Sequence, residues 1–230
     1  MSVLIFIDAA EGQVKKSSLE ALTYGAKISE QLGVAAEGVV LGNVTEDLAA
    51  LGKYGVKKIH QVSNDALKNL DAQVYANVIA QVAEASGATV IVFSNSMDGK
   101  AIAPRLSARM KAGLVAGAVA LPDTSNGFTV KKSVFSGKAF ANISVATPVK
   151  IISLSPNAYK TEAGEGTAEV VAFSATVDAP KVKVTSVNKA SGEVSLTEAE
   201  IVVSAGRGLK GPENWGMVED LAHTLHAATA

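Results

Sequence analysis

The chain has 230 residues, of which 48% are hydrophobic and 19% are charged, and its formal net charge at pH 7 is -1. This composition is typical of a core-forming globular chain and excludes disorder as the main state, and the length suits one large domain or two modest ones. The balanced charge gives no basic face for nucleic acid, and the absence of cysteine excludes disulfides, thiolate nucleophiles and cysteine-held metal clusters.

The chain starts on a short apolar run, residues 3–7, with no basic segment and no long apolar region before it. No apolar stretch approaches the roughly 18 uninterrupted residues that a membrane-spanning helix needs. We therefore expect no signal or transit peptide, no membrane insertion, and a location in the bacterial cytoplasm.

Strand and helix patterns alternate over residues 3–93. Helices are expected from a cap at Ser17 or Ser18 to Gly33, over 45–51, and over 71–85 before Gly87. Strands are expected at 3–7, 39–41, 58–62 and 89–93. The last strand is apolar on both faces, as in a sheet that helices cover. The alternation predicts an α/β fold with three layers, a mainly parallel sheet flanked by helices, Rossmann-like and nucleotide-hydrolase-like.

Polar residues 94–100 follow the strand at 89–93, and a helix is expected from residue 101 with Pro104 in its first turn. The carboxyl end of a central strand is where doubly wound sheets usually bind ligands. No paired acid and base stand here, however, and Arg105 and Arg109 have the spacing of a solvated helix face. A structural or subunit-contact role is favoured over ligand binding.

Short alternating segments follow Gly113, at 115–121, 128–134, 142–145 and 150–154. Turn formers separate them, which predicts antiparallel strands and hairpins added to the first sheet. Residues 182–187, followed by Ser191 and Gly192, have the pattern of an edge strand and loop. We expect an N-terminal α/β domain over 1–178, a linker over 179–198, and the start of a second domain over 199–230, consisting of one βα unit.

A glycine-rich turn connects an apolar run, residues 201–204, with an amphipathic helix pattern near the end of the chain. The run predicts a buried strand, and the glycines, including Gly206 and Gly208, permit positive φ and close backbone approach. Pro212 suits the first turn of a helix. The turn would leave free N–H groups beside the fixed charge of Arg207, for which a nucleotide or dinucleotide is the natural occupant.

A tight connection that binds nothing remains the alternative for this turn. The spacing departs from G-x-G-x-x-G, and no acidic ribose ligand stands about 20 residues further on. Glu219 and Asp220 come too early, inside the helix pattern. An ordinary NAD fingerprint is therefore not supported.

The remaining candidates are weaker. His223 and His226 share a helix face, but with no cysteine or acidic pair nearby they are expected to face solvent or a partner, and no metal site is predicted. His60, in a strand, is expected to pack or cap, and Trp215 to anchor a helix. Ser94, Ser96 and Ser204 lack the context of a nucleophile elbow. No catalytic residue is predicted.

Three features in order resemble the alpha subunit of electron transfer flavoprotein, over nearly the whole chain. They are a Gly-Lys-x-x-x-Pro-Arg-Leu-x-x-Arg segment at 99–109, a Ser-x-x-Ser-Gly hairpin at 133–137, and Val-Val-Ser-Ala-Gly-Arg-Gly-Leu-Lys at 202–210 followed by Glu-Asn at 213–214. The last feature opens that family's flavin domain, and residues 220–228 resemble the helix after it.

The resemblance implies an electron carrier subunit rather than a self-contained enzyme. It implies a heterodimer with a beta subunit and FAD held mainly by the alpha subunit's C-terminal domain. Electrons would pass from dehydrogenases such as acyl-CoA dehydrogenases, as in fatty acid β-oxidation, to the respiratory chain through a membrane quinone oxidoreductase. Arg207 matches the arginine that contacts FAD in the family, and Gly206 and Gly208 match the turn around it.

Members of this family continue through a serine-arginine turn and a glutamine-threonine-glycine segment that also hold the cofactor, whereas this sequence ends at Ala230. We therefore expect a chain with only the start of the FAD-binding domain, which binds FAD weakly or not at all by itself. A lone βα unit cannot bury both faces of its strand, so residues 200–230 should be loosely held or packed on a neighbouring chain. Two alternatives stay open: a non-redox adenine-nucleotide-binding or partner-docking module, and a nucleotide-dependent dehydrogenase.

Overall fold

The computed structural model describes residues 1–187, 196, 199 and 201–230. These residues form two compact units, Met1–Lys183 and Val184–Ala230. The predicted domain boundaries at 178 and 199 stay a proposal, because half of the linker between them lies outside the described residues.

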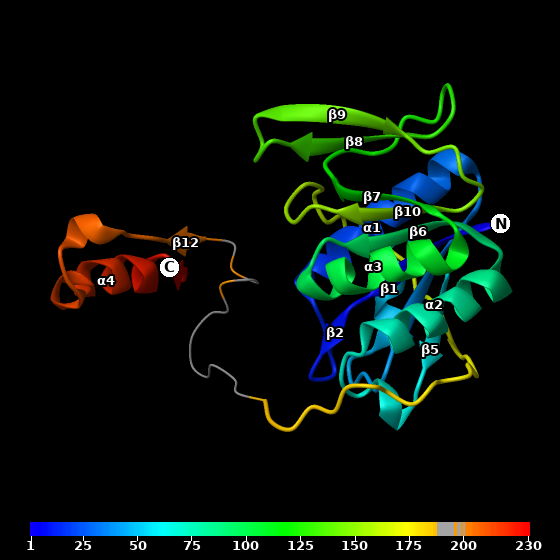
Figure 1. The fold of residues 1–230 in the computed structure, drawn as a ribbon, viewed down its shortest axis with the longest axis horizontal. Coiled ribbons are helices and arrows are strands. Elements are labelled where there is room, and N and C mark those ends of the chain that lie inside the picture. Colours follow the sequence, from blue (N-terminus) through cyan, green and yellow to red (C-terminus); the bar gives the residue numbers. More distant parts are fainter. Residues whose placement is uncertain (188–195, 197–198, 200) are drawn as a thin grey trace. The chain divides into compact units, whose positions relative to one another are not determined.

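The first unit is built on one sheet, in which nine strands of the described residues lie in the order β11-β5-β4-β1-β6-β10-β7-β8-β9 (Figure 1). The bounds of these strands are β1 Ser2–Ile7, β4 Ala35–Leu41, β5 Lys58–Val62, β6 Ala88–Ser94, β7 Gly113–Ala118, β8 Thr129–Val134, β9 Ala139–Ser144, β10 Lys150–Leu154 and β11 Glu169–Ala172. The strands from β11 to β7 are parallel, and β8 and β9 continue the sheet antiparallel. A separate small hairpin joins β2 (Ala9–Ala10) to β3 (Gln13–Val14).

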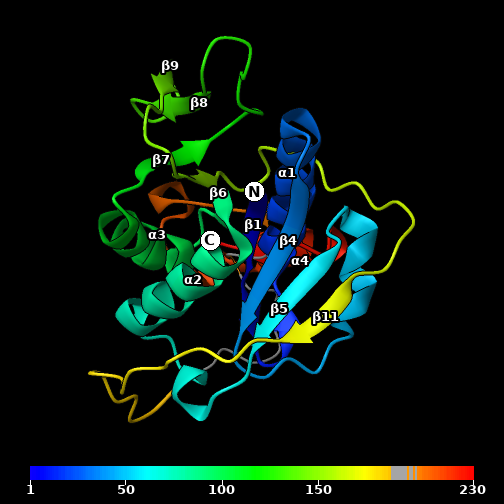
Figure 2. The same ribbon diagram turned by 90° about the vertical axis from the view of Figure 1, so that its right-hand side faces the viewer.

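Helices cover both faces of the parallel strands. Every residue of β1 is buried, and alternate side chains point to opposite faces. Ile5 packs in the core beside α1 (Lys16–Leu32), whereas Leu4 packs in the core beside α2 (Ala72–Ser86) and α3 (Met97–Met110). Figure 2 shows α2 and α3 together on one side of β4 and β5. The predicted three-layer α/β fold is confirmed.

The helix ends follow local rules. Gly33 and Gly87 end α1 and α2 in the left-handed conformation, with φ of 63° and 62°, as predicted. Asp71 caps α2, because its Oδ1 accepts hydrogen bonds from the N–H groups of Gln73 at 3.0 Å and Val74 at 3.2 Å.

Two predicted helix starts were wrong. Neither Ser17 nor Ser18 caps α1, which begins after Lys15, and the Ser18 hydroxyl instead bonds the backbone N–H and carbonyl of Asp8. Helix α3 begins at Met97 rather than at residue 101, because the Ser96 hydroxyl accepts the N–H of Gly99 at 3.1 Å and caps an earlier turn. Pro104 therefore lies inside α3.

The helix predicted over 45–51 is a 3₁₀ turn, Leu48–Tyr54, capped by Asp47 and ended by Gly55. A second 3₁₀ turn, Asp65–Leu67, precedes α2. The short length of the first segment and the glycine that ends it limit it to a tight turn.

The strand pairing after Gly113 differs from the prediction. β10 lies parallel between β6 and β7, and only the β7–β8 and β8–β9 pairs are antiparallel. The edge position falls to β11, which was not predicted. Residues 182–187 form no strand, and Ser191 and Gly192 lie outside the described residues.

The second unit contains β12 (Val202–Val203), α4 (Gly216–Thr224) and β13 (Ala228–Thr229). β12 and β13 are parallel, so the unit is a βαβ arrangement and not the single βα unit that was predicted. The predicted buried strand was also wrong, since Ile201 and Val202 are 47% and 44% exposed. Val218, Ala222 and Ala228 are the buried apolar residues among those described in this unit.

Candidate functional site

The glycine turn of the second unit runs from residue 205 to residue 211 and contains the 3₁₀ turn Arg207–Leu209. The N–H of Leu209 donates to the Gly206 carbonyl at 3.0 Å, and the N–H of Lys210 donates to the Arg207 carbonyl at 3.0 Å. Glycines permit positive φ, but in this turn Lys210 adopts it, at 68°, and Gly206 is extended. Gly206 is therefore not required here for its backbone conformation.

Gly206 and Gly208 leave open space beside the backbone of the turn. A Cβ placed on Gly206 or Gly208 would meet no protein atom within 4 Å. Within the described residues the N–H groups of Gly206, Arg207 and Gly208 donate no hydrogen bond, and Arg207 is exposed and makes no ion pair. The turn presents backbone donors and a guanidinium cation to an unfilled space, which fits an anionic group such as a phosphate.

The residues after the turn hold its shape. Asn214 donates from its side-chain amide to the Leu209 carbonyl at 2.7 Å. The 3₁₀ turn Pro212–Asn214 begins with Pro212 in its first turn, as predicted, and leads through Trp215 into α4. The sequence analysis gave Asn214 no role, although a side-chain amide just after a glycine turn is well suited to bond the turn's carbonyls.

A second polar cluster lies where the sheet order turns back, at the carboxyl ends of β1 and β6. The Lys15 ammonium lies 2.9 Å from Asp8 Oδ2 and 2.7 Å from Asp98 Oδ2. Ser96 donates to Asp8 Oδ2 at 3.3 Å. Three separate segments are thus joined at the position where parallel sheets form a crevice. Sequence reasoning examined residues 94–100 but missed Asp8 and Lys15, which lie far away in sequence.

Burial is the largest single influence on the pKa of Asp8 and of Lys15. It raises the pKa of Asp8 to about 6, against the opposing effect of Lys15. Burial lowers the pKa of Lys15, but the hydrogen bond to Asp98 and the charge of Asp8 outweigh it, so the pKa of Lys15 is raised overall. A cavity of about 200 Å³ adjoins the cluster. Lys15 lies between both carboxylates and pairs with each of them. The charges of the cluster are therefore paired with one another, and the network links the start of α1 to α3.

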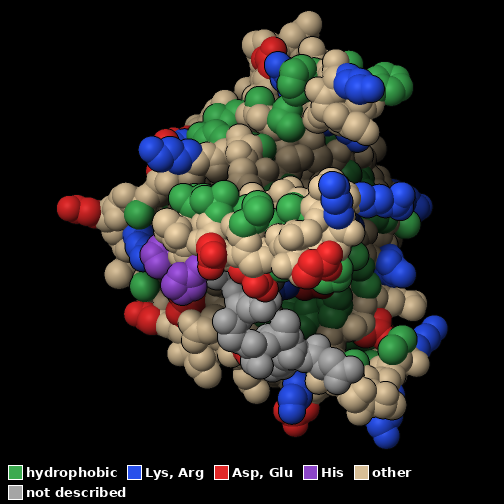
Figure 3. Space-filling view, turned by 90° about the vertical axis from the view of Figure 1, so that its left-hand side faces the viewer, with side chains coloured by type: hydrophobic (Ala, Val, Ile, Leu, Met, Phe, Trp, Pro, Cys, Tyr) green, Lys and Arg blue, Asp and Glu red, His purple; other side chains and the backbone are tan. Residues whose placement is uncertain are grey.

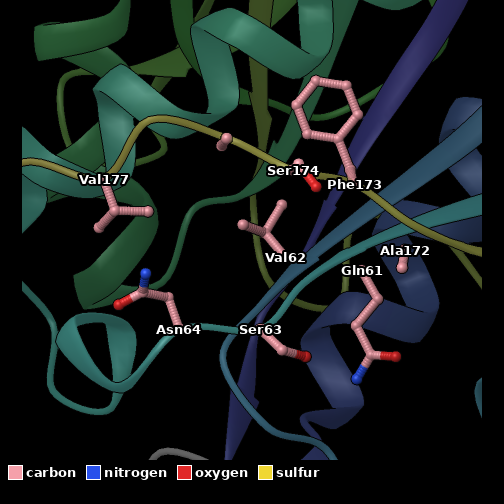
Figure 4. Close-up of a pocket in the computed structure, with 9 residues that line it drawn as sticks. Gln61, Val62, Ser63, Asn64, Ala172, Phe173, Ser174 and Val177 are labelled. Atoms are coloured by element: carbon pink, nitrogen blue, oxygen red, sulfur yellow. The ribbon is translucent and has the colours of Figure 1, made fainter.

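A larger cavity, of about 290 Å³, lies between the end of β5 and the chain after β11 (Figure 4). The side chains of Ser63 and Asn64 line it from one segment, and Ala172 and Val177 from the other. None of its lining residues is charged, so it offers no ionisable acid or base for chemistry.

Comparisons with known proteins show the family of the chain. A family model described as the electron transfer flavoprotein domain matches residues 3–178. A model described as the electron transfer flavoprotein FAD-binding domain matches residues 195–230. The chain belongs to the electron transfer flavoprotein family. The predicted resemblance is therefore confirmed, and the glycine turn falls inside the match to the FAD-binding domain.

Curated relatives identify the subunit within electron transfer flavoprotein. The alpha subunit of Syntrophomonas wolfei is 31% identical over 229 residues, which cover 97% of this chain and 71% of that protein. Those of Mycobacterium leprae and Bacillus subtilis are 30% and 29% identical, and each alignment covers 98% of this chain and 70% of the relative. The chain is thus an electron transfer flavoprotein alpha subunit, with FAD as the cofactor of the complete complex.

His223 and His226 are exposed, and no described group of three histidine, cysteine, aspartate or glutamate side chains could hold a metal. His60 packs edge-on against Phe173, with Nε2 2.6 Å from Glu37 Oε2. No described helix is long and apolar enough to cross a membrane.

Proposed function

We propose that this chain carries electrons as the alpha subunit of a heterodimer with a beta subunit, in the bacterial cytoplasm. The donors would be dehydrogenases such as acyl-CoA dehydrogenases, and the acceptor a membrane quinone oxidoreductase. The observation that carries the proposal is the match of the FAD-binding model to residues 195–230, which include the open, cationic glycine turn. When bound, FAD supplies the redox chemistry, and the protein supplies binding and electrostatics.

We assign FAD binding to Arg207, Gly206 and Gly208. The Arg207 guanidinium would pair with an anionic phosphate, and its charge does not depend on pH near neutrality. The two glycines would admit the ligand close to backbone N–H groups, because no protein atom occupies the space where their side chains would be. Asn214 acts as a positioning residue through its bond to the Leu209 carbonyl.

We further propose that the chain alone retains FAD weakly. β12 and β13 form a sheet of two strands in the described part of the second unit, and such small sheets are marginally stable by themselves. Met217, Leu221 and Leu225 on and just after α4 are 67%, 50% and 43% exposed, so the apolar face of this unit lacks a covering layer.

The first test replaces Arg207. Arg207→Ala should lower the flavin content of the complete alpha-beta complex about tenfold, because a charge-assisted pair to phosphate is lost. Lys57→Ala removes a positive charge from an exposed residue before β5 and is the matched control. The readout is visible flavin absorbance per complex, with complex formation checked by gel filtration.

Equal flavin content in the two variants would remove Arg207 from the site.

Donor identity is tested separately, by mixing the flavin-loaded complex with a reduced acyl-CoA dehydrogenase and following the loss of flavin absorbance. Absence of reduction there would contradict the donor assignment and leave the FAD site standing.

A further inference from the structure

The chain leaves β11 as an extended segment that lies on α2, and we call residues 173–183 the strap. Phe173, Ala175 and Val177 are half-buried and pack against the core beside α2 and α3, whereas the residues between them are exposed. This alternation is that of an extended chain with one face on a surface. Figure 2 shows the segment after β11, in yellow, passing beside α2. Residues 178–183 are all exposed, so burial of apolar side chains holds only the first half of the strap.

Two side chains of α2 hold the strap by hydrogen bonds. Gln81 bonds both backbone groups of Thr176, since its Nε2 donates to the carbonyl at 2.9 Å and its Oε1 accepts the N–H at 2.9 Å. Asn77, four residues earlier on the same face of the helix, donates from its amide to Asp178 Oδ2 at 2.6 Å. The strap therefore runs antiparallel to α2.

Asp71 joins the second half of the strap to the start of α2. Its Oδ2 accepts the N–H of Lys181 at 3.1 Å, while its Oδ1 caps the helix. Burial raises the pKa of Asp71, but four backbone hydrogen bonds, including those from Lys181 and Val182, lower it overall. Strap and helix also match in length: α2 rises about 15 Å from Gln81 to Asp71, and an extended chain rises about 17 Å from Thr176 to Lys181.

We propose that residues 178–183 are a detachable latch, which Asp71 and Asn77 hold on α2 and whose release lengthens the tether to the second unit. With the latch closed, the chain leaves the first unit at Lys183. Release moves this point back to the apolar anchor at Val177. The six freed residues then add up to about 20 Å of reach to the unit that matches the FAD-binding model.

The chemistry of the latch suits repeated opening and closing. Hydrogen bonds at an exposed surface contribute little net stability, because water replaces them when they break. Release therefore costs far less than detaching the half-buried Phe173, Ala175 and Val177. Pro180 favours reclosure, since it fixes its own φ and restricts Ala179 to an extended conformation, which reduces the entropy lost on docking.

Timed trypsin cleavage of the full chain after Lys181 and Lys183 tests the latch, because the protease needs the released state. Asp71→Asn should speed this cleavage about tenfold. The asparagine Oδ1 still caps α2, but the amide nitrogen that replaces Oδ2 cannot accept the Lys181 N–H. Asp65→Asn changes an exposed carboxylate before α2 and is the matched control, which should alter the rate less than twofold.

Asn77→Ala separates the latch from the stability of α2. It should speed cleavage about threefold through loss of the bond to Asp178, and alanine raises helix propensity, so a weaker helix would not account for the change. Cleavage after Lys138, exposed in the β8–β9 turn, is the internal reference and should stay constant. Figure 3 shows Lys and Arg side chains at several separate places on one face, which supply further reference sites.

Tether length is measured by the distance between two spin labels. The chain has no cysteine, so Lys100→Cys on α3 and Asp220→Cys on α4 accept labels without background. Adding Asp71→Asn should broaden the distance distribution and extend it by up to about 20 Å, whereas adding Asp65→Asn should leave it unchanged.

Equal cleavage rates in Asp71→Asn and Asp65→Asn, or label distances that do not change in Asp71→Asn, would overturn the inference. Neither measurement uses flavin or the beta subunit. A complex that fails to carry electrons would therefore contradict the proposed function and leave the latch standing.

Discussion

Asp8 lies at the carboxyl end of β1, and its side chain is only 5% exposed to water. Burial raises its pKa from 3.8 to about 6. A carboxyl whose pKa is raised on folding gives its greatest stabilisation below the unfolded value, and this contribution is lost as the pH rises through the folded value. The stabilisation should therefore fall between about pH 4 and pH 6.

Asp8→Asn tests this pH dependence. The wild-type free energy of unfolding should fall by on the order of 2 kcal/mol more than that of the variant between pH 4 and pH 7, because the variant cannot ionise at this position. Lys15 keeps Asp98 as a partner in the variant. The measurement is urea unfolding at a series of pH values, with Glu165→Gln as an exposed control. Parallel pH profiles for wild type and Asp8→Asn would refute the assignment.

At the scale of elements, β11 depends on a close backbone approach. The chain at Thr167 and Ala168 passes directly over Gly52, in the 3₁₀ turn Leu48–Tyr54, and a Cβ on Gly52 would collide with the backbone of both residues. The Ala168 N–H also donates to the Ala49 carbonyl at 2.9 Å. Gly52 therefore sets the path by which the chain reaches the sheet edge.

Gly52→Ala should destabilise the first unit by about 1–3 kcal/mol, since the neighbouring atoms are backbone and cannot rotate away. Gly216→Ala is the matched control, because a Cβ there meets no atom within 4 Å and lies at the start of α4. Thermal unfolding measures both. If Gly52→Ala melts at the wild-type temperature, the close approach does not constrain β11.

Local signals in the sequence predicted the elements that local chemistry determines. Asp71 and Gly87 bounded α2 correctly, and the apolar runs of β1 and β6 predicted buried parallel strands. Pairing between distant segments could not be predicted in the same way. The position of β10 between β6 and β7, and of β11 beside β5, depends on contacts that no local pattern encodes.

The same limit applies to the candidate sites. The glycine turn was found because its residues are adjacent in sequence, whereas the hydrogen bond from Lys15 to Asp98 joins residues 83 positions apart. β13 was not predicted, because a strand of two small residues carries almost no pattern. The left-handed conformation of His226 ends the helical run instead.

On the scale of the whole molecule, the described chain has two units. The first is an α/β unit in which Asp8, Lys15 and Asp98 form a paired polar network. The second is a small unit with an open cationic turn. The described part of the second unit offers the turn that we assign to an anionic cofactor, but it has a sheet of only two strands and leaves apolar side chains exposed. For this reason we expect FAD retention to depend on assembly with a partner chain.

The most direct measurement of this account is the FAD content of the chain purified alone and purified with its beta subunit, with the Bacillus subtilis alpha and beta subunits as the reference pair. We predict little or no flavin on the chain alone and measurable flavin in the complete alpha-beta complex, lost in Arg207→Ala. A complete complex that forms but stays colourless after incubation with FAD, beside a yellow reference pair, would contradict the electron-carrier function.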